Sequence, residues 1–173
     1  MGSCFGNLLR ISVFGESHGS AIGVTIDGFP AGIALDTAFV AREMARRAPS
    51  SSPASTARRE EDIPRILSGV KDGVTTGAPI CMIIENTDAH SGDYAPFAQT
   101  PRPGHADYTA SVRYHEHQDA AGGGHFSGRL TAPIVFAGAL AKLALAKEQI
   151  QIGAHRLQVG DVFDDQFSRI ALT

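Results

Sequence analysis

Glycine is the residue whose distribution most restricts how this chain can fold. The sequence contains 19 glycines among its 173 residues, and they gather in a few clusters beside histidine, serine and arginine. Glycine adopts backbone conformations that other residues avoid, so each cluster predicts either a turn or a place where the backbone approaches a ligand closely. The regular elements must therefore fit between these clusters.

The segments between the clusters predict an α+β fold. Strands are expected at residues 8–14, 21–27, 63–67, 78–85 and 150–159. Asp36 can cap a helix from Thr37 to Arg47, and a second helix is expected from Thr131 to about Glu148. We expect antiparallel strands with both long helices on one face, and we assign residues 1–173 to part of one domain.

Composition indicates a soluble globular protein, with 43% hydrophobic and 19% charged residues. A net charge of −3 gives no general attraction to nucleic acid or to an anionic membrane. The most apolar stretch, residues 132–146, is interrupted by Lys142 and falls short of the ~20 residues that span a bilayer. We interpret it as a buried helix, and in the absence of a visible secretory signal we expect a cytoplasmic location.

The first candidate site is the turn from Gly15 to Gly19, which follows a predicted strand and contains Ser17 and His18. A histidine there can donate a proton near neutral pH, and neighbouring backbone N–H groups can contact a ligand. Adjacent residues on an extended backbone point to opposite sides, so Ser17 and His18 are not expected to pair as nucleophile and base.

The second candidate is the segment Pro101–Tyr108, in which prolines stiffen a loop that carries Arg102 and His105. The guanidinium of Arg102 can bind a carboxylate or phosphate at two points. Asp107 or Tyr108 could orient His105.

Two further segments suit an anionic ligand. A basic group surrounds the end of the first helix and comprises Arg42, Arg46, Arg47, Arg58 and Arg59. Cations at a helix C-terminus also stabilise the helix dipole, so these arginines have a purely structural explanation as well. The run Gly122–Gly124 precedes the second helix and could form an anion cradle or a flexible linker.

A metal site is the alternative from another class of function. His115, His117 and Asp119 have a spacing that can bind a metal from a strand, which would suit a small metal-dependent hydrolase. No third ligand at a suitable partner spacing supports this reading, so no metal is expected.

Taken in order, these segments resemble the N-terminal half of the chorismate synthase family. The matching segments read GESHGSAIGVTIDGFPAG, MARRAPS, SGVKDGVTTGAPI, ENTDAHSGDY, RPGHADYT and GGGHFSGRLTA. They extend from about Phe5 to Ala146, which is most of the chain.

The resemblance implies a lyase that eliminates phosphate anti-1,4 from 5-enolpyruvylshikimate 3-phosphate to give chorismate, in aromatic amino acid biosynthesis. It implies reduced FMN as cofactor, admits NADPH as reductant, and predicts a layered β-α-β sandwich, here incomplete, that assembles as a homotetramer. Catalytic roles are implied for His18, beside the departing phosphate, and for His105, which would protonate reduced flavin. Binding of substrate is implied for Ser17, Arg47, Arg102 and Arg129, and binding of cofactor for Arg47, His125, Phe126 and Ser127.

This chain departs from the family pattern at three places. His125-Phe126-Ser127 replaces Arg-Ser-Ser, Pro53 stands where a second arginine is expected, and the basic helix ends in Ala48-Pro49-Ser50 where Arg-Pro-Gly is usual. These changes lower the local positive charge. Members of the family are also longer than this chain, so the alternative within the family is a truncated, catalytically inactive fragment.

Overall fold

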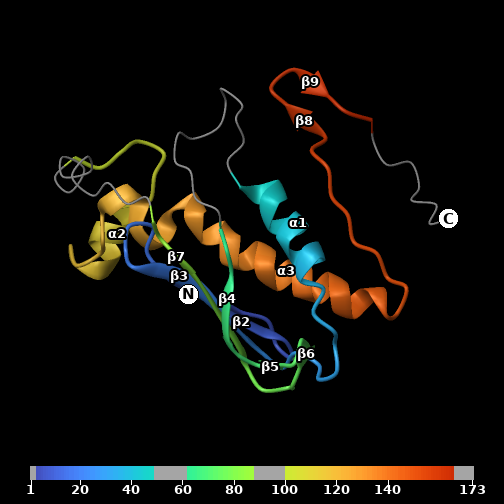
Figure 1. The fold of residues 1–173 in the computed structure, drawn as a ribbon. Helices are drawn as coiled ribbons and strands as arrows, with labels where there is room; N and C mark the ends of the chain where they lie inside the picture. Colours follow the sequence, from blue (N-terminus) through green and yellow to red (C-terminus); the bar gives the residue numbers. More distant parts are fainter. Residues whose placement is uncertain (1–2, 49–61, 88–99, 166–173) are drawn as a thin grey trace.

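Five antiparallel strands form the sheet on which the rest of the fold is built (Figure 1). The structure is a computed structural model, and it describes residues 3–48, 62–87 and 100–165. The strand order is β1 (Cys4–Phe5), β2 (Arg10–Gly15), β3 (Ala21–Asp27), β7 (Ile80–Glu85), β4 (Arg65–Ser68). Pro53, Arg58 and Arg59 lie outside the described residues.

The register of the central strands places the apolar side chains on one face. Ile22 lies opposite Ile84, and Val24 lies opposite Met82, and all four are buried. Because side chains alternate along a strand, this pairing collects every second residue of β3 and β7 into the core. The sheet therefore has one face that a helix must cover.

Two helices cover that face. Helix α3 (Thr131–Ala146) packs on the sheet, and α1 (Thr37–Arg47) packs against α3 (Figure 1). Asp36 caps α1 as expected, because its Oδ1 accepts from the N–H of Phe39 at 2.8 Å. Phe136 of α3 is fully buried in the core. The α+β class with antiparallel strands and helices on one face is confirmed.

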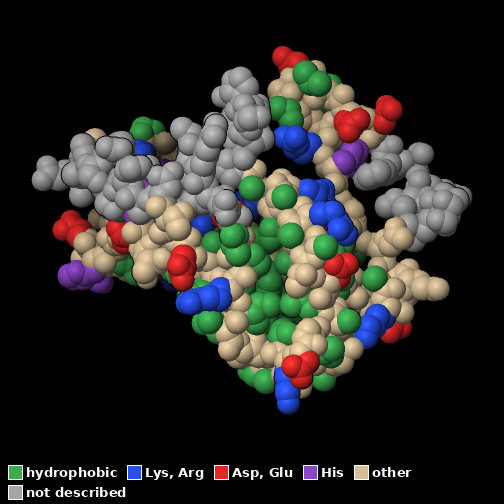
Figure 2. Space-filling view, in the orientation of Figure 1, with side chains coloured by type: hydrophobic (Ala, Val, Ile, Leu, Met, Phe, Trp, Pro, Cys, Tyr) green, Lys and Arg blue, Asp and Glu red, His purple; other side chains and the backbone are tan. Residues whose placement is uncertain are grey.

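Helix α3 is apolar around much of its circumference. The helical segment 128–146 is long and apolar enough to cross a membrane, judged by length and composition alone. It is one segment of this kind within the part of the chain that the structure describes. The core helix of a soluble protein passes the same test, and α3 lies against the sheet with Phe136 and Leu140 buried. Figure 2 shows hydrophobic side chains gathered on the face where α1 and α3 lie.

The remaining elements are short. They are β5 (Val70–Lys71), β6 (Val74–Thr75), α2 (Asp107–Tyr114), the 3-10 segments Ala121–Phe126 and Gly128–Leu130, β8 (Gln158–Val159) and β9 (Val162–Phe163). The strand expected at 150–159 is wrong except for its last two residues. Residues 150–157 are exposed and pair with no strand among the described residues. Helix α2 was not expected, since the prolines and glycine before it favoured a loop.

The buried side chains of α3 are expected to stabilise the fold more than its exposed side chains do. Phe136→Ala should lower that free energy by about 3–5 kcal/mol, because a fully buried ring leaves a cavity. Ile134→Ala is the control on the same helix, since Ile134 is 43% exposed, and it should cost less than about 1 kcal/mol. Urea unfolding followed by circular dichroism measures both, and equal losses would contradict the packing of α3.

Candidate active site

A glycine turn brings the two candidate histidines together. Residues 122–124 all have positive φ, at 60°, 102° and 53°. A Cβ atom at Gly122 would overlap the imidazole of His18, and one at Gly123 would lie 2.8 Å from Nε2 of His105. Both imidazoles therefore pack against backbone that must lack side chains. Sequence reasoning expected an anion cradle or a linker here and did not foresee this contact.

His18 is held through Ser17. Ser17 is fully buried, and its backbone N–H donates to the carbonyl of Gly124 at 3.1 Å. Its hydroxyl donates to the carbonyl of Ala121 at 3.3 Å and lies 3.1 Å from Nδ1 of His18. Since that hydroxyl hydrogen is used, Oγ accepts from an Nδ1–H of His18. Ser17 and His18 come within hydrogen-bond distance because they lie in a turn and not on an extended strand. With Oγ as the acceptor, this contact is not the pairing of a nucleophile with its base that the sequence argued against.

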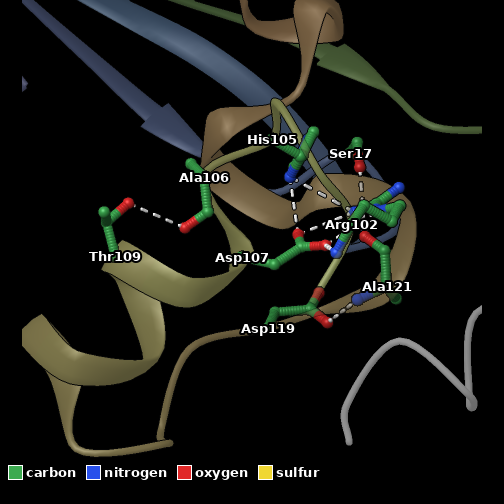
Figure 3. Close-up of polar contacts among 8 residues, drawn as sticks. All are labelled: Ser17, Arg102, His105, Ala106, Asp107, Thr109, Asp119 and Ala121. Atoms are coloured by element: carbon green, nitrogen blue, oxygen red, sulfur yellow. Dashed lines mark hydrogen bonds and ion pairs between the residues drawn. The ribbon is translucent and has the colours of Figure 1, made fainter. Parts of the chain in front are cut away.

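His105 is held by an ion pair (Figure 3). Asp107 Oδ1 accepts from Nδ1 of His105 at 2.5 Å. Arg102 donates to both oxygens of Asp107, from Nε to Oδ2 and from Nη2 to Oδ1, each at 2.8 Å. The Arg102 guanidinium holds the pKa of the Asp107 carboxyl well below its usual range. An ionised Asp107 accepts the Nδ1 hydrogen, so Nε2 of His105 points to the glycine turn.

Asp107, and not Tyr108, orients His105. The Tyr108 side chain is 66% exposed, whereas that of Asp107 is 9% exposed and lies in the first turn of α2. Arg102 was expected to bind the anionic substrate. In this structure its guanidinium forms a two-point ion pair with Asp107, which is the geometry a substrate carboxylate would offer.

A buried carboxylate joins the two other candidate arginines. The two oxygens of Asp62 accept from Nη1 of Arg47 and Nη1 of Arg129. The three side chains are 1%, 18% and 5% exposed, in the order Asp62, Arg47, Arg129. Arg47 thus does more than stabilise the end of α1. Asp62 has no distinctive sequence signal, and sequence reasoning missed it.

The predicted flavin-contact residues have internal partners. His125 donates from Nδ1 to the carbonyl of Gly15 at 2.8 Å, and its Nε2 lies 2.5 Å from Oγ of Ser3. Ser127 Oγ accepts from the N–H of Arg129 at 3.3 Å and caps the short segment before α3. Phe126 is 42% exposed. Of these three side chains, that of Phe126 is the one turned to open space.

Phe126 is part of the lining of two cavities. One, of about 580 Å³, has Gly123 and three acidic side chains in its lining, namely Asp107, Glu116 and Asp119. The other, of about 470 Å³, is lined by residues that include Val13, Phe14, Tyr114 and His125. The first cavity lies beside His105, since Asp107 and Gly123 both contact that ring.

The residues proposed as an alternative metal site, His115, His117 and Asp119, lie at and after the end of α2. His115 adopts a left-handed conformation and terminates α2, and the backbone N–H of His117 donates to the carbonyl of Tyr114 at 3.1 Å. Within residues 3–48, 62–87 and 100–165, no group of three or more His, Cys, Asp or Glu side chains is placed to hold a metal ion.

Removing the buried carboxylate should destabilise the protein strongly. Asp62→Ala leaves two mostly buried guanidinium groups close together, so the free energy of unfolding should fall by about 3–5 kcal/mol. Glu43 bonds Lys142 at 2.7 Å and Arg46 at 3.2 Å at a more exposed place, so Glu43→Ala should cost about 1 kcal/mol or less. Urea unfolding compares the two, and a smaller loss in Asp62→Ala would contradict the bridging role.

The ion pair of Asp107 should make stability depend on pH. Because the folded pKa is depressed, the ionised carboxyl contributes stability above the ordinary carboxyl pKa of about 4, and this contribution is lost as the pH falls toward the folded pKa. The difference in unfolding free energy between wild type and Asp107→Asn should therefore be larger at pH 7 than at pH 3. Urea titrations at both pH values measure it, and a difference independent of pH would refute the ion pair.

Comparison with known proteins identifies the family of this chain. The family model described as chorismate synthase matches residues 9–172. A chorismate synthase of Aeropyrum pernix is 50% identical over 91% of this chain and 41% of its own length, and that of Thermococcus kodakarensis is 48% identical over 91% and 44%. A crystal structure of a chorismate synthase superposes with a TM-score of 0.67 at 26% identity, covering 95% of this chain and 42% of the other.

The family match covers nearly the whole chain, whereas the chain spans less than half the length of these curated relatives. The matched range, residues 9–172, contains the glycine turn, both histidine segments and the arginines that Asp62 joins. The chain belongs to the chorismate synthase family.

Proposed function

We propose that this chain supplies the histidine and arginine part of a chorismate synthase site. The reaction is the anti-1,4-elimination of phosphate from 5-enolpyruvylshikimate 3-phosphate, a carbon–oxygen lyase activity that gives chorismate. The observation that carries the proposal is the packing of His18 and His105 against adjacent glycines of one turn. Each ring has its Nδ1 held by a protein group, so each Nε2 is oriented for proton transfer.

The phosphate leaves as a multiply charged anion. A protonated His18 would donate to a departing phosphate oxygen from Nε2, which lowers the barrier for cleavage of the C–O bond. Arg47 and Arg129 both place a guanidinium group at this buried cluster. A guanidinium group at a buried place can stabilise the negative charge of an anion that approaches it.

The cofactor proposed is FMN in its reduced form, which when bound supplies electron density for cleavage of a C–H bond that is not acidic. The cavity of about 580 Å³ beside His105 has the volume of a small-molecule site, and Phe126 offers a flat apolar wall. These features fit the flavin ring. The cavity is also lined by the acidic residues Asp107, Glu116 and Asp119, which would repel the negatively charged phosphate of FMN. Within the described residues, the fit therefore extends to the ring and not to the phosphate.

His105 would act at the flavin side of the site. Asp107 holds its Nδ1 hydrogen, and Nε2 faces the turn that separates it from His18. It would hold or move a proton at Nε2, while the carboxylate keeps the ring from rotating. Arg102 would keep Asp107 ionised.

The other family properties are proposed from membership alone. They are the homotetramer, the cytoplasmic location, and NADPH as a reductant that contacts Arg47. A net charge of −3 offers no support for a nucleic acid or membrane partner.

An inactive fragment of the enzyme is the second candidate. It is favoured by the coverage of 41–44% of the relatives' lengths and by the lack of a cation among the described residues that line the cavity beside His105. Such a chain would bind substrate without turning it over.

One pair of measurements separates these candidates. Purified chain is supplied anaerobically with pre-reduced FMN and 5-enolpyruvylshikimate 3-phosphate, and chorismate is measured. Binding of the same substrate is measured by calorimetry. Turnover supports the enzyme, binding without turnover supports the inactive fragment, and the lack of both contradicts the proposal.

His18→Ala should separate a chemical role from a structural one. If the chain turns over, this variant should lose about 10²–10⁴-fold in rate because it lacks the proton donor. If the chain only binds, the variant should bind substrate more weakly. His155→Ala is the matched control, because His155 lies in the C-terminal segment beside Asp164, and it should leave both readouts unchanged. Equal behaviour of the two variants would remove His18 from the site.

A further inference from the structure

Asn86 connects the His18 turn with Arg129. It follows β7 directly, and its Nδ2 donates to the carbonyl of Glu16 at 3.0 Å and to that of Gly19 at 2.8 Å. Its Oδ1 accepts from Nε of Arg129 at 3.2 Å. Both ends of one side-chain amide are therefore used, each toward a different part of the candidate site.

The partners determine which way the amide faces. Two carbonyl oxygens can only accept, so they require the NH₂ end, and a guanidinium N–H can only donate, so it requires the oxygen. The two carbonyls belong to residues on either side of His18, so the amide closes the turn that carries this histidine. The backbone N–H of Asn86 adds a third bond to this loop, to the carbonyl of Ser20 at 3.1 Å.

A continuous chain of polar contacts results. It runs from the His18 turn through Asn86 to Arg129, and from Arg129 through Asp62 to Arg47. Arg129 is 5% exposed and Asp62 1% exposed, so the ion pair between them is shielded from water and strengthened accordingly, whereas the contacts of Asn86 are more exposed. The neutral side chain of Asn86 thus connects the turn of His18, the candidate proton donor, with the charged cluster of Arg129, Asp62 and Arg47.

We propose that Asn86 is a positioning residue that sets the place of His18 relative to Arg129. The catalytic meaning of this placement rests on the proposed function, in which His18 gives a proton to the phosphate that the arginines attract. No other standard side chain of this size offers two donors and one acceptor in this geometry. Aspartate keeps the shape and the acceptor but lacks the donors, and alanine lacks both.

Two substitutions separate the two ends of the amide. In the ¹⁵N-labelled chain, Asn86→Asp and Asn86→Ala should both shift the imidazole signals of His18, which are assigned by their loss in His18→Gln. The Nε–H signal of Arg129 should stay in place in Asn86→Asp, which keeps its acceptor, and move in Asn86→Ala. Amide signals of β3 and β7 report whether each variant folds. Unchanged His18 signals in either folded variant would overturn the proposal.

A measurement on the unaltered chain covers the case in which neither variant folds. The sequence has one other asparagine, Asn7, which is exposed. The side-chain NH₂ hydrogens of Asn86 should exchange with solvent at least about tenfold more slowly than those of Asn7, and equal rates would overturn the proposal. None of these readouts needs turnover, so a chain that fails to form chorismate counts against the proposed function and leaves this test intact.

Discussion

The site depends on a stretch of backbone that carries no side chains. His18 and His105 come from distant parts of the sequence, and each packs where a side chain at Gly122 or Gly123 would have to lie. Positive φ at both glycines makes this approach accessible without the strain that other residues would suffer. Close packing against a common turn, and not proximity in sequence, determines where the two imidazole rings lie relative to each other.

Each histidine is then oriented by a different kind of partner. His18 has a buried hydroxyl, and His105 has a carboxylate that is itself held by an arginine. The partner of His105 carries a charge and the partner of His18 does not, so the two rings have different electrostatic surroundings on one turn. Groups with different surroundings suit different proton-transfer roles.

The sheet and the helices position the segments that carry His18, Asn86 and Arg129. β2 and β3 lead into and out of the His18 turn, Asn86 follows the end of β7, and Arg129 lies in the short 3-10 segment that precedes α3. Because these elements share one core, the turn, the amide and the arginine belong to a single packed unit. The arginine cluster adds Arg47 from α1 through Asp62. Long-range contacts thus converge on one end of the sheet.

The sequence by itself determined the strands at the centre of the sheet, the two long helices, the Asp36 cap and the family, because periodicity, caps and motifs are local signals. Only the tertiary structure decided what the motifs contact. It brought Ser17 and His18 within hydrogen-bond distance, and it gave the glycine run two imidazoles as neighbours. It also revealed Asp62 and Asn86, whose partners lie 15–70 residues away. These contacts form only when segments distant in the sequence come together in the folded chain, so no local sequence pattern predicts them.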